Sequence, residues 1–171
     1  MIYKVIVADG ITERTCCLKV FLKDWTTPYN LEITAYAYLR HAGLKYFIPK
    51  VLARGQRTVS GWGLEDVDGE TEGGFYGILM EWIDGSEMLS DENVTLEHAQ
   101  CLVRGLMKIH EAGVLHNDAF PKNMLVVPGT GRAVWVDFSC AKIGLPDEFE
   151  YEMRVGGLIP IQLVFWLTSV R

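Results

Sequence analysis

Apolar and polar positions at the start of the chain follow the two-residue period of β-strands. Residues 2–7 alternate weakly, Asp9-Gly10 marks a turn, and residues 15–21 form a second run rich in apolar and β-branched residues. Lys19 stands in the middle of this second run. The pattern therefore predicts a β-hairpin whose returning strand carries a lysine.

The next segment changes to helical spacing. Apolar side chains recur at intervals of three and four over residues 31–42. Thr27 suits the N-cap, Pro28 suits the first helical position, and Gly43 follows the last turn. Glu32 lies at the edge of the apolar stripe of this predicted helix.

The middle of the chain predicts two strands, a loop and a second helix. Residues 48–53 and 75–83 are apolar runs, and the glycine-rich acidic stretch over residues 61–74 reads as an exposed loop between them. Helical spacing returns from about Thr95 and ends at Gly113.

Two short apolar runs then enclose a polar group. Val114-Leu115 and residues 124–127 predict short strands on either side of the sequence HNDAFPKN, and residues 133–136 return as a strand after a Pro-Gly-Thr-Gly turn. Polar side chains pinned between two buried strands suit a chemical site, but they also suit a plain loop. The order of elements predicts an α+β fold.

Composition limits the classes of function. The chain has 171 residues, 49% of them hydrophobic, and a formal net charge of −6. This length allows a real core, and the acidic balance argues against a broad basic surface for nucleic acid or anionic membranes. The four cysteines show no C-x-x-C spacing, which argues against a zinc site and favours reduced thiols. With no signal-peptide pattern, we expect a cytoplasmic or nuclear protein.

The uncharged segment over residues 155–170 is slightly short for a membrane span and contains Pro160. We expect this segment to be buried against the second helix rather than to anchor the chain in a membrane.

Five polar residues carry the candidate chemistry. Each has an ordinary structural explanation, because a strand lysine can point to water, helical glutamates commonly lie on the surface, and loop aspartates commonly turn the chain. Together they match the needs of phosphoryl transfer from ATP: a cation with a partner, oxygen ligands for Mg²⁺, and a carboxylate near the attacking hydroxyl. Lys19 would be the cation and Glu32 its partner. Asn123 and Asp137 would be the oxygen ligands, and Asp118 the carboxylate.

These residues stand in motifs that resemble those of the protein-kinase-like superfamily. LHNDAFPKNMLV resembles the catalytic loop and VDFS the D-F-G motif, while CLKVF resembles the strand with the phosphate-binding lysine. LEITAYAYL resembles the helix with the partner glutamate, and ILMEWIDG the strand and hinge beside adenine. The motifs follow the family order from about residue 2 to about residue 142, in the style of divergent small kinase-like proteins of fungi.

The resemblance implies a two-lobed kinase-like fold with ATP and Mg²⁺ as cofactors. A small β-rich N-lobe and hinge would span residues 1–85, and a partial, helical C-lobe would span residues 86–171. It also implies a role for each residue of the motifs. The roles are catalytic for Asp118, Lys19 and Glu32; nucleotide-binding for Lys19, Glu81, Trp82 and Ile83; metal-binding for Asn123 and Asp137; and structural for His116.

The sequence departs from the family pattern at several points. No G-x-G-x-x-G loop precedes Lys19, so the first strand and the phosphate loop are missing from the pattern. Asn117 replaces the usual arginine, Phe120 stands where a lysine is usual, and Ser139 replaces the glycine of D-F-G. No A-P-E motif follows Asp137, which predicts a truncated C-lobe.

The sequence therefore favours ATP-dependent phosphoryl transfer to a protein serine or threonine hydroxyl. One alternative is a pseudokinase or truncated relic that acts as a binding module, because the glycine loop is missing. A second is a small-molecule kinase of the aminoglycoside or choline type, since those enzymes also lack the arginine. A third is a protein held at a membrane by its C-terminal segment. The expected partners are a nucleotide and a protein or small-molecule acceptor, and nucleic acid is not expected.

Overall fold

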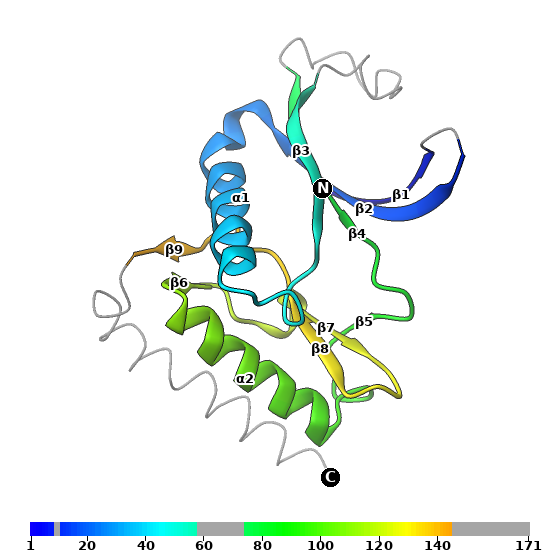
Figure 1. Ribbon diagram of the computed structural model, residues 1–171, viewed down its shortest axis with the longest axis vertical. Helices are drawn as coiled ribbons and strands as arrows, with labels where there is room; N and C mark the ends of the chain where they lie inside the picture. Colours follow the sequence, from blue (N-terminus) through cyan, green and yellow to red (C-terminus); the bar gives the residue numbers. More distant parts are fainter. Residues whose placement is uncertain (9–10, 58–73, 145–171) are drawn as a thin grey trace.

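The first half of the chain forms a four-stranded antiparallel sheet (Figure 1). The computed structural model describes residues 1–8, 11–57 and 74–144. The strand order is β1-β2-β4-β3, so β2 is paired on both sides and β3 lies at an edge. The strands are β1 Ile2–Ala8, β2 Glu13–Leu22, β3 Val51–Arg57 and β4 Phe75–Glu81.

Helix α1, Thr26–His41, follows β2 through a single 3-10 turn at Lys23–Trp25. The predicted N-cap at Thr27 is wrong, because this turn leads directly into the helix and Thr27 already lies within it. The predicted end is confirmed: Gly43 follows the helix with a φ of +80°, in the left-handed region that glycine adopts without strain.

The second half of the chain contains one long helix and two small antiparallel sheets. The sheets have the orders β5-β7-β8 and β6-β9, and helix α2 packs on β8. The elements are β5 Glu87–Met88, α2 Leu96–Glu111, β6 Val114–Leu115, a 3-10 turn at Pro121–Asn123, β7 Met124–Val127, β8 Arg132–Trp135 and β9 Lys142–Ile143.

Helix α2 begins where the sequence predicts. Thr95 is its N-cap: the Thr95 hydroxyl oxygen accepts from the backbone N–H of His98 at 3.2 Å, and Nδ1 of His98 accepts from the backbone N–H of Thr95 at 3.3 Å. This reciprocal pair is a capping box with histidine in place of the usual glutamate. The helix ends before Gly113, which has a φ of +77°.

One buried cluster connects the two halves of the chain. Leu39 of α1, Leu102 of α2 and Trp135 of β8 are all fully buried in it. The indole N–H of Trp135 donates to the carbonyl oxygen of Leu102 at 3.0 Å, which satisfies its only polar group. This packing fixes the β7–β8 hairpin, and the residues that precede and follow it, against α2.

Some predictions differ from the structure. The strand predicted at residues 48–53 lies at Val51–Arg57, and the short strands β5 and β9 were not predicted. The predicted loop at 61–74 falls, except for its last residue, outside the described residues, as does the C-terminal segment at 155–170. No helix among the described residues is long and apolar enough to cross a membrane.

Candidate functional site

Lys19 lies at the centre of a buried ionic cluster. Its side-chain nitrogen is 2.6 Å from Oε2 of Glu32 and 2.7 Å from Oδ1 of Asp137. Lys19 is 7% exposed and Glu32 is fully buried. The ordinary explanations for both residues are therefore wrong here: the strand lysine does not point to water, and the helical glutamate does not lie on the surface. The structure brings together three of the five predicted residues by direct contact.

The sheet and α1 fix the geometry of this cluster. Lys19 lies on β2, where it is held between Ile2 of β1 and Ile78 of β4 by pairing on both sides. Glu32 projects from the buried face of α1, which packs beside β2. A buried charge is tolerated only when it is paired, and Lys19 has one carboxylate on each side.

Asp137 is held in an uncommon backbone conformation. It follows β8 with a φ of +63°, in the left-handed region that non-glycine residues rarely adopt. The backbone N–H and the hydroxyl of Ser139 both donate to its Oδ1 atom. Burial raises the pKa of Asp137, but Lys19 and the Ser139 donors outweigh burial and hold that pKa below its ordinary value. The carboxylate is therefore kept ionised and directed at Lys19.

Glu32 shows the opposite behaviour. Burial raises the pKa of Glu32 from 4.5 to about 7, although the charge and hydrogen bond of Lys19 act to lower it. Lys19 also pairs with Asp137, so its positive charge offsets only part of the cost of burying an ionised Glu32. The carboxyl group of Glu32 therefore titrates near neutral pH.

The polar loop before β7 forms a second cluster. The side-chain amide of Asn123 donates to the backbone carbonyl of Asp118 and to its Oδ2 atom, each at 2.8 Å. The Lys122 nitrogen lies 2.9 Å from the same Oδ2 atom. Because Asn123 uses its NH₂ group for both bonds, its carbonyl oxygen Oδ1 stays available as a ligand.

Backbone hydrogen bonds join this loop to Asp137. The N–H of Val136 donates to the carbonyl of Asn123 at 3.0 Å, and the Val136 carbonyl lies 3.0 Å from Nε2 of His116. Since a carbonyl only accepts, Nε2 carries the proton in this bond. His116 is fully buried, and this burial lowers its pKa, so the ring stays neutral. The structural role predicted for His116 agrees with this geometry.

Three rings connect α1 to the loop. The His116 and Phe138 ring centres are 4.6 Å apart, and Tyr36 meets Phe138 edge-on at 5.1 Å. Tyr36 lies four residues after Glu32 on the buried face of α1. The stack therefore ties the helix that carries Glu32 to the segment that carries Asp137.

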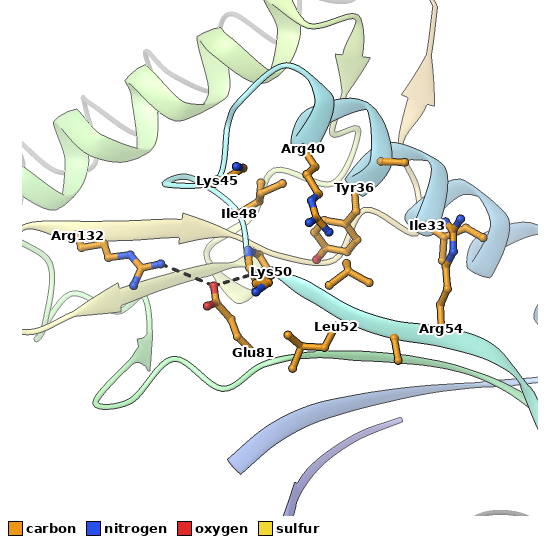
Figure 2. A pocket seen from close by; sticks show the side chains of 14 residues that line it. Ile33, Tyr36, Arg40, Lys45, Ile48, Lys50, Leu52, Arg54, Glu81 and Arg132 are labelled. Carbon is orange, nitrogen blue, oxygen red and sulfur yellow. Dashed lines mark hydrogen bonds and ion pairs between the residues drawn. The ribbon is translucent and has the colours of Figure 1, made fainter. Parts of the chain in front are cut away.

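The contacts described for the three predicted hinge residues involve neither the Lys19 cluster nor the loop of Asp118 and Asn123. Oε1 of Glu81 accepts from the backbone N–H of Lys50 at 3.0 Å, Trp82 lies 4.7 Å from the Lys4 nitrogen, and Ile83 is buried. Figure 2 shows the Glu81 carboxylate directed at Arg132 of β8, whose Nη2 atom lies 3.9 Å from Oε1 of Glu81. A role for these residues in binding adenine through their backbone stays a prediction.

The donor set fits a magnesium ion that arrives with phosphates. Asn123 Oδ1 and the Asp137 carboxylate are hard oxygen ligands, and Mg²⁺ is commonly bound by one or two such groups together with substrate phosphates. In the part of the chain that the structure describes, no group of three or more His, Cys, Asp or Glu side chains is placed to hold a metal. The residues therefore fit a shared ion rather than a fully protein-bound one.

Two contact residues of the site were missed by the sequence reasoning. Lys122 pairs with Asp118, and Ser139 donates to Asp137. The four-residue spacing from Asp118 to Lys122 was no signal for this pair, because that spacing predicts contact only on a helix and this segment is a loop. Ser139 was noted only as a substitution for glycine, and its hydrogen bond follows from a backbone conformation that the sequence does not display.

Comparison with known proteins gives a partial similarity. No family model matches the chain. MAP kinase kinase kinase SSK2 of Saccharomyces cerevisiae is 34% identical over 73 residues, which cover 38% of this chain and 5% of that protein. The chain thus spans a small fraction of the length of this relative, and the similarity indicates a kinase-related region and no more.

Proposed function

We propose that the chain binds a magnesium–ATP complex and transfers its γ-phosphoryl group to a hydroxyl. The observation that carries the proposal is that the Lys19 nitrogen contacts both Glu32 and Asp137. The segment that carries Asp137 is joined to the loop of Asp118 and Asn123 by the hydrogen bond from the Val136 N–H to the Asn123 carbonyl. The two-lobed kinase-like fold, with halves at residues 1–85 and 86–171, belongs to the same proposal. A four-stranded sheet with α1, followed by two small sheets with α2, supports it.

Lys19 would bind the nucleotide phosphates. Its contact with Asp137 is direct at 2.7 Å, so a phosphate oxygen would replace that contact. Glu32 would then remain the partner that keeps the lysine oriented, because its Oε2 atom lies 2.6 Å from the same nitrogen. A cation that is already in position, in a site from which water is excluded, can stabilise the negative charge that develops on the phosphate oxygens. The protein then does not have to rearrange during the reaction.

Asn123 and Asp137 would hold the ion. When bound, Mg²⁺ supplies positive charge that neutralises the phosphate oxygens. Asn123 is suited to this role because its NH₂ group is fixed on Asp118, which leaves the carbonyl oxygen as the ligand. Asp137 is suited because its pKa lies below the ordinary value, so the carboxylate is ionised at neutral pH.

Asp118 would receive the proton in the transfer step. The acceptor oxygen forms a bond to the γ-phosphorus, the bond from that phosphorus to the β–γ bridging oxygen breaks, and ADP leaves. The hydroxyl proton passes to the Asp118 carboxylate. Phe120 stands where the family pattern usually has a lysine. Lys122, whose nitrogen lies 2.9 Å from Asp118, would supply a cation near the transferred phosphoryl group in its place.

The acceptor we favour is a protein serine or threonine hydroxyl. The partial similarity to a MAP kinase kinase kinase supports a protein acceptor. A small-molecule hydroxyl is the alternative acceptor, because Asn117 stands in place of the arginine that such kinases also lack. A binding module without turnover is the second candidate function, and the departures from the family pattern at Phe120 and Ser139 favour it.

Two measurements on one set of variants test the proposal. We expect ATP with Mg²⁺ to raise the thermal unfolding temperature and to be converted to ADP. Asp137→Ala should abolish both effects, whereas Asp91→Ala, an exposed aspartate on the loop before α2, should preserve them. A thermal shift without ADP formation would favour the binding module. If neither effect occurs in the wild type, the proposal is wrong.

A further inference from the structure

A groove lies between α1 and β3. It encloses about 590 Å³, and Figure 2 shows the side chains that line it. Its apolar wall comes from both elements and from the segment between them. The larger aliphatic residues of this wall are Ile33, Ile48, Val51 and Leu52. A volume of this size is typical of a ligand site.

The charge of this groove is opposite to that of the chain as a whole. Five cationic side chains and a single carboxylate, that of Glu81, line the groove, whereas the chain carries a formal net charge of −6. The cations come from α1, the following loop, β3 and β8. They are Arg40, Lys45, Lys50, Arg54 and Arg132.

Among the described residues, carboxylates pair with only part of this positive charge. Arg132 has a carboxylate partner, but its Nη2 atom lies 3.9 Å from Glu81, at the limit of an ion pair. The Nε atom of Arg132 is buried and has no hydrogen-bond partner among the described residues. In the same part of the chain, no ion pair joins Arg40 or Arg54 to a carboxylate.

The groove also follows an open strand edge. Within the described residues β3 pairs with β4 alone, so its other edge faces away from the sheet. Ala53 and Arg54 of this edge strand line the groove, and both are exposed. An edge strand offers backbone N–H and C=O groups to an added extended segment.

We propose that this groove binds an acidic, amphipathic peptide segment of a partner protein. A small anion would account for the cations but not for the apolar wall, and an apolar ligand would account only for the wall. An extended peptide uses all three features: carboxylates at the cations, an apolar side chain against Ile33 and Leu52, and backbone bonds along β3. The binding itself does not depend on the phosphoryl transfer proposed above.

The position of the groove connects it to the ionic cluster. Glu32 and Tyr36 lie four residues apart on the buried face of α1, and Tyr36 also lines the groove together with Ile33 and Arg40. A peptide in the groove would therefore contact the same helix that positions Lys19.

The first test is a selection from a random peptide display library on the full chain. We expect enriched peptides to carry several Asp or Glu residues around at least one large apolar residue. Enrichment of acidic peptides without an apolar preference would indicate a simple anion site and overturn the proposal. Selection without acidic enrichment would overturn it as well.

The second test measures the most enriched peptide by fluorescence anisotropy. Arg40→Glu with Arg54→Glu should weaken binding by about ten-fold or more, because like charges brought together at an interface are strongly unfavourable. Ala37→Trp, which fills the groove without changing charge, should weaken binding as well. Arg14→Glu with Arg104→Glu reverses two exposed arginines outside the groove and should leave affinity unchanged.

Equal losses in the groove variant and the control variant would contradict the site. ATP binding, measured on the same variants, separates this proposal from the preceding one. Loss of peptide binding with normal ATP binding supports the groove independently. Peptide binding in a chain that does not bind ATP would leave the groove intact and remove only the proposed enzymatic function.

Discussion

Lys19 shares one positive charge between two carboxylates inside the protein. Glu32 is fully buried and Asp137 is partly buried, so the Coulomb attraction to Lys19 opposes a large desolvation cost. The pKa values of the two acids move in opposite directions. Burial dominates at the fully buried Glu32, whereas at the partly buried Asp137 the charge and hydrogen bond of Lys19 and the two hydrogen bonds from Ser139 outweigh burial. The cluster therefore holds one firmly ionised carboxylate and one that titrates near neutral pH.

Removal of the cation should be costly. We expect Lys19→Met to lower the free energy of unfolding by about 3 kcal/mol, because it leaves two carboxylates near one another without compensation. Urea denaturation measures the loss, and Lys108→Met, an exposed lysine on α2, is the control. The loss in Lys19→Met with Glu32→Gln should be smaller than the sum of the single losses. Equal stability of Lys19→Met and Lys108→Met would contradict the buried cluster.

Glu32 should give stability a pH dependence of defined sign. Because its pKa is raised from 4.5 to about 7 in the folded state, the folded chain binds more protons than the unfolded chain between these values. The stability contributed by Glu32 is therefore present at low pH and is lost as pH rises through this window. Relative to Glu32→Gln, the wild type should lose about 2.5 kcal/mol between about pH 5 and about pH 8.

Urea denaturation of both proteins at the two pH values, without divalent metal, measures this difference. Asp137 contributes little to it, because a lowered pKa acts below the range tested. A stability difference that stays constant, or that grows in favour of the wild type as pH rises, would contradict the raised pKa of Glu32.

Among the elements, those with local signals were predicted well. The start of α2 follows from Thr95, a cap that acts within four residues, and the end of α1 follows from Gly43. The start of α1 and the position of β3 were less accurate. Ile48 is apolar because it packs in the core before the strand, not because it belongs to the strand. Strand β9 pairs with β6 across a long sequence separation, which two-residue strands cannot reveal.

The packing of α2 depends on a glycine within the helix. A Cβ atom at Gly105 would lie 2.8 Å from a ring carbon of Phe47 and 3.3 Å from Trp135. Alanine is the better helix former by about 1 kcal/mol, but the overlap with the partly buried Phe47 ring and the tight contact with the buried Trp135 ring should outweigh this gain. We expect Gly105→Ala to lower the free energy of unfolding by about 1–2 kcal/mol.

Thermal denaturation measures this effect, and the neighbouring Arg104→Ala is the matched control because that side chain is exposed. An increase in the unfolding temperature of Gly105→Ala would contradict the close packing of α2 on Phe47.

At the scale of the whole molecule, the candidate site is assembled from three distant segments. Lys19 comes from β2, Glu32 from α1, and the remaining groups from residues 116–139. The sequence indicated these residues because their types and order match one chemistry. It did not indicate the α1–β3 groove, whose cations are spread over α1, β3 and β8 and show no local pattern. The roles of Lys122 and Ser139 likewise depend on contacts formed only in the folded chain.

The central claim is that Lys19 is the lysine beside the phosphates of a bound nucleotide. An acyl-phosphate derivative of ATP tests it most directly, because attack by a nearby lysine nitrogen forms an amide and releases ATP. The account predicts that mass spectrometry will find the acyl group on Lys19, and that excess ATP with Mg²⁺ will prevent this labelling. If exposed lysines such as Lys108 are acylated instead, with no protection by ATP, the account is contradicted.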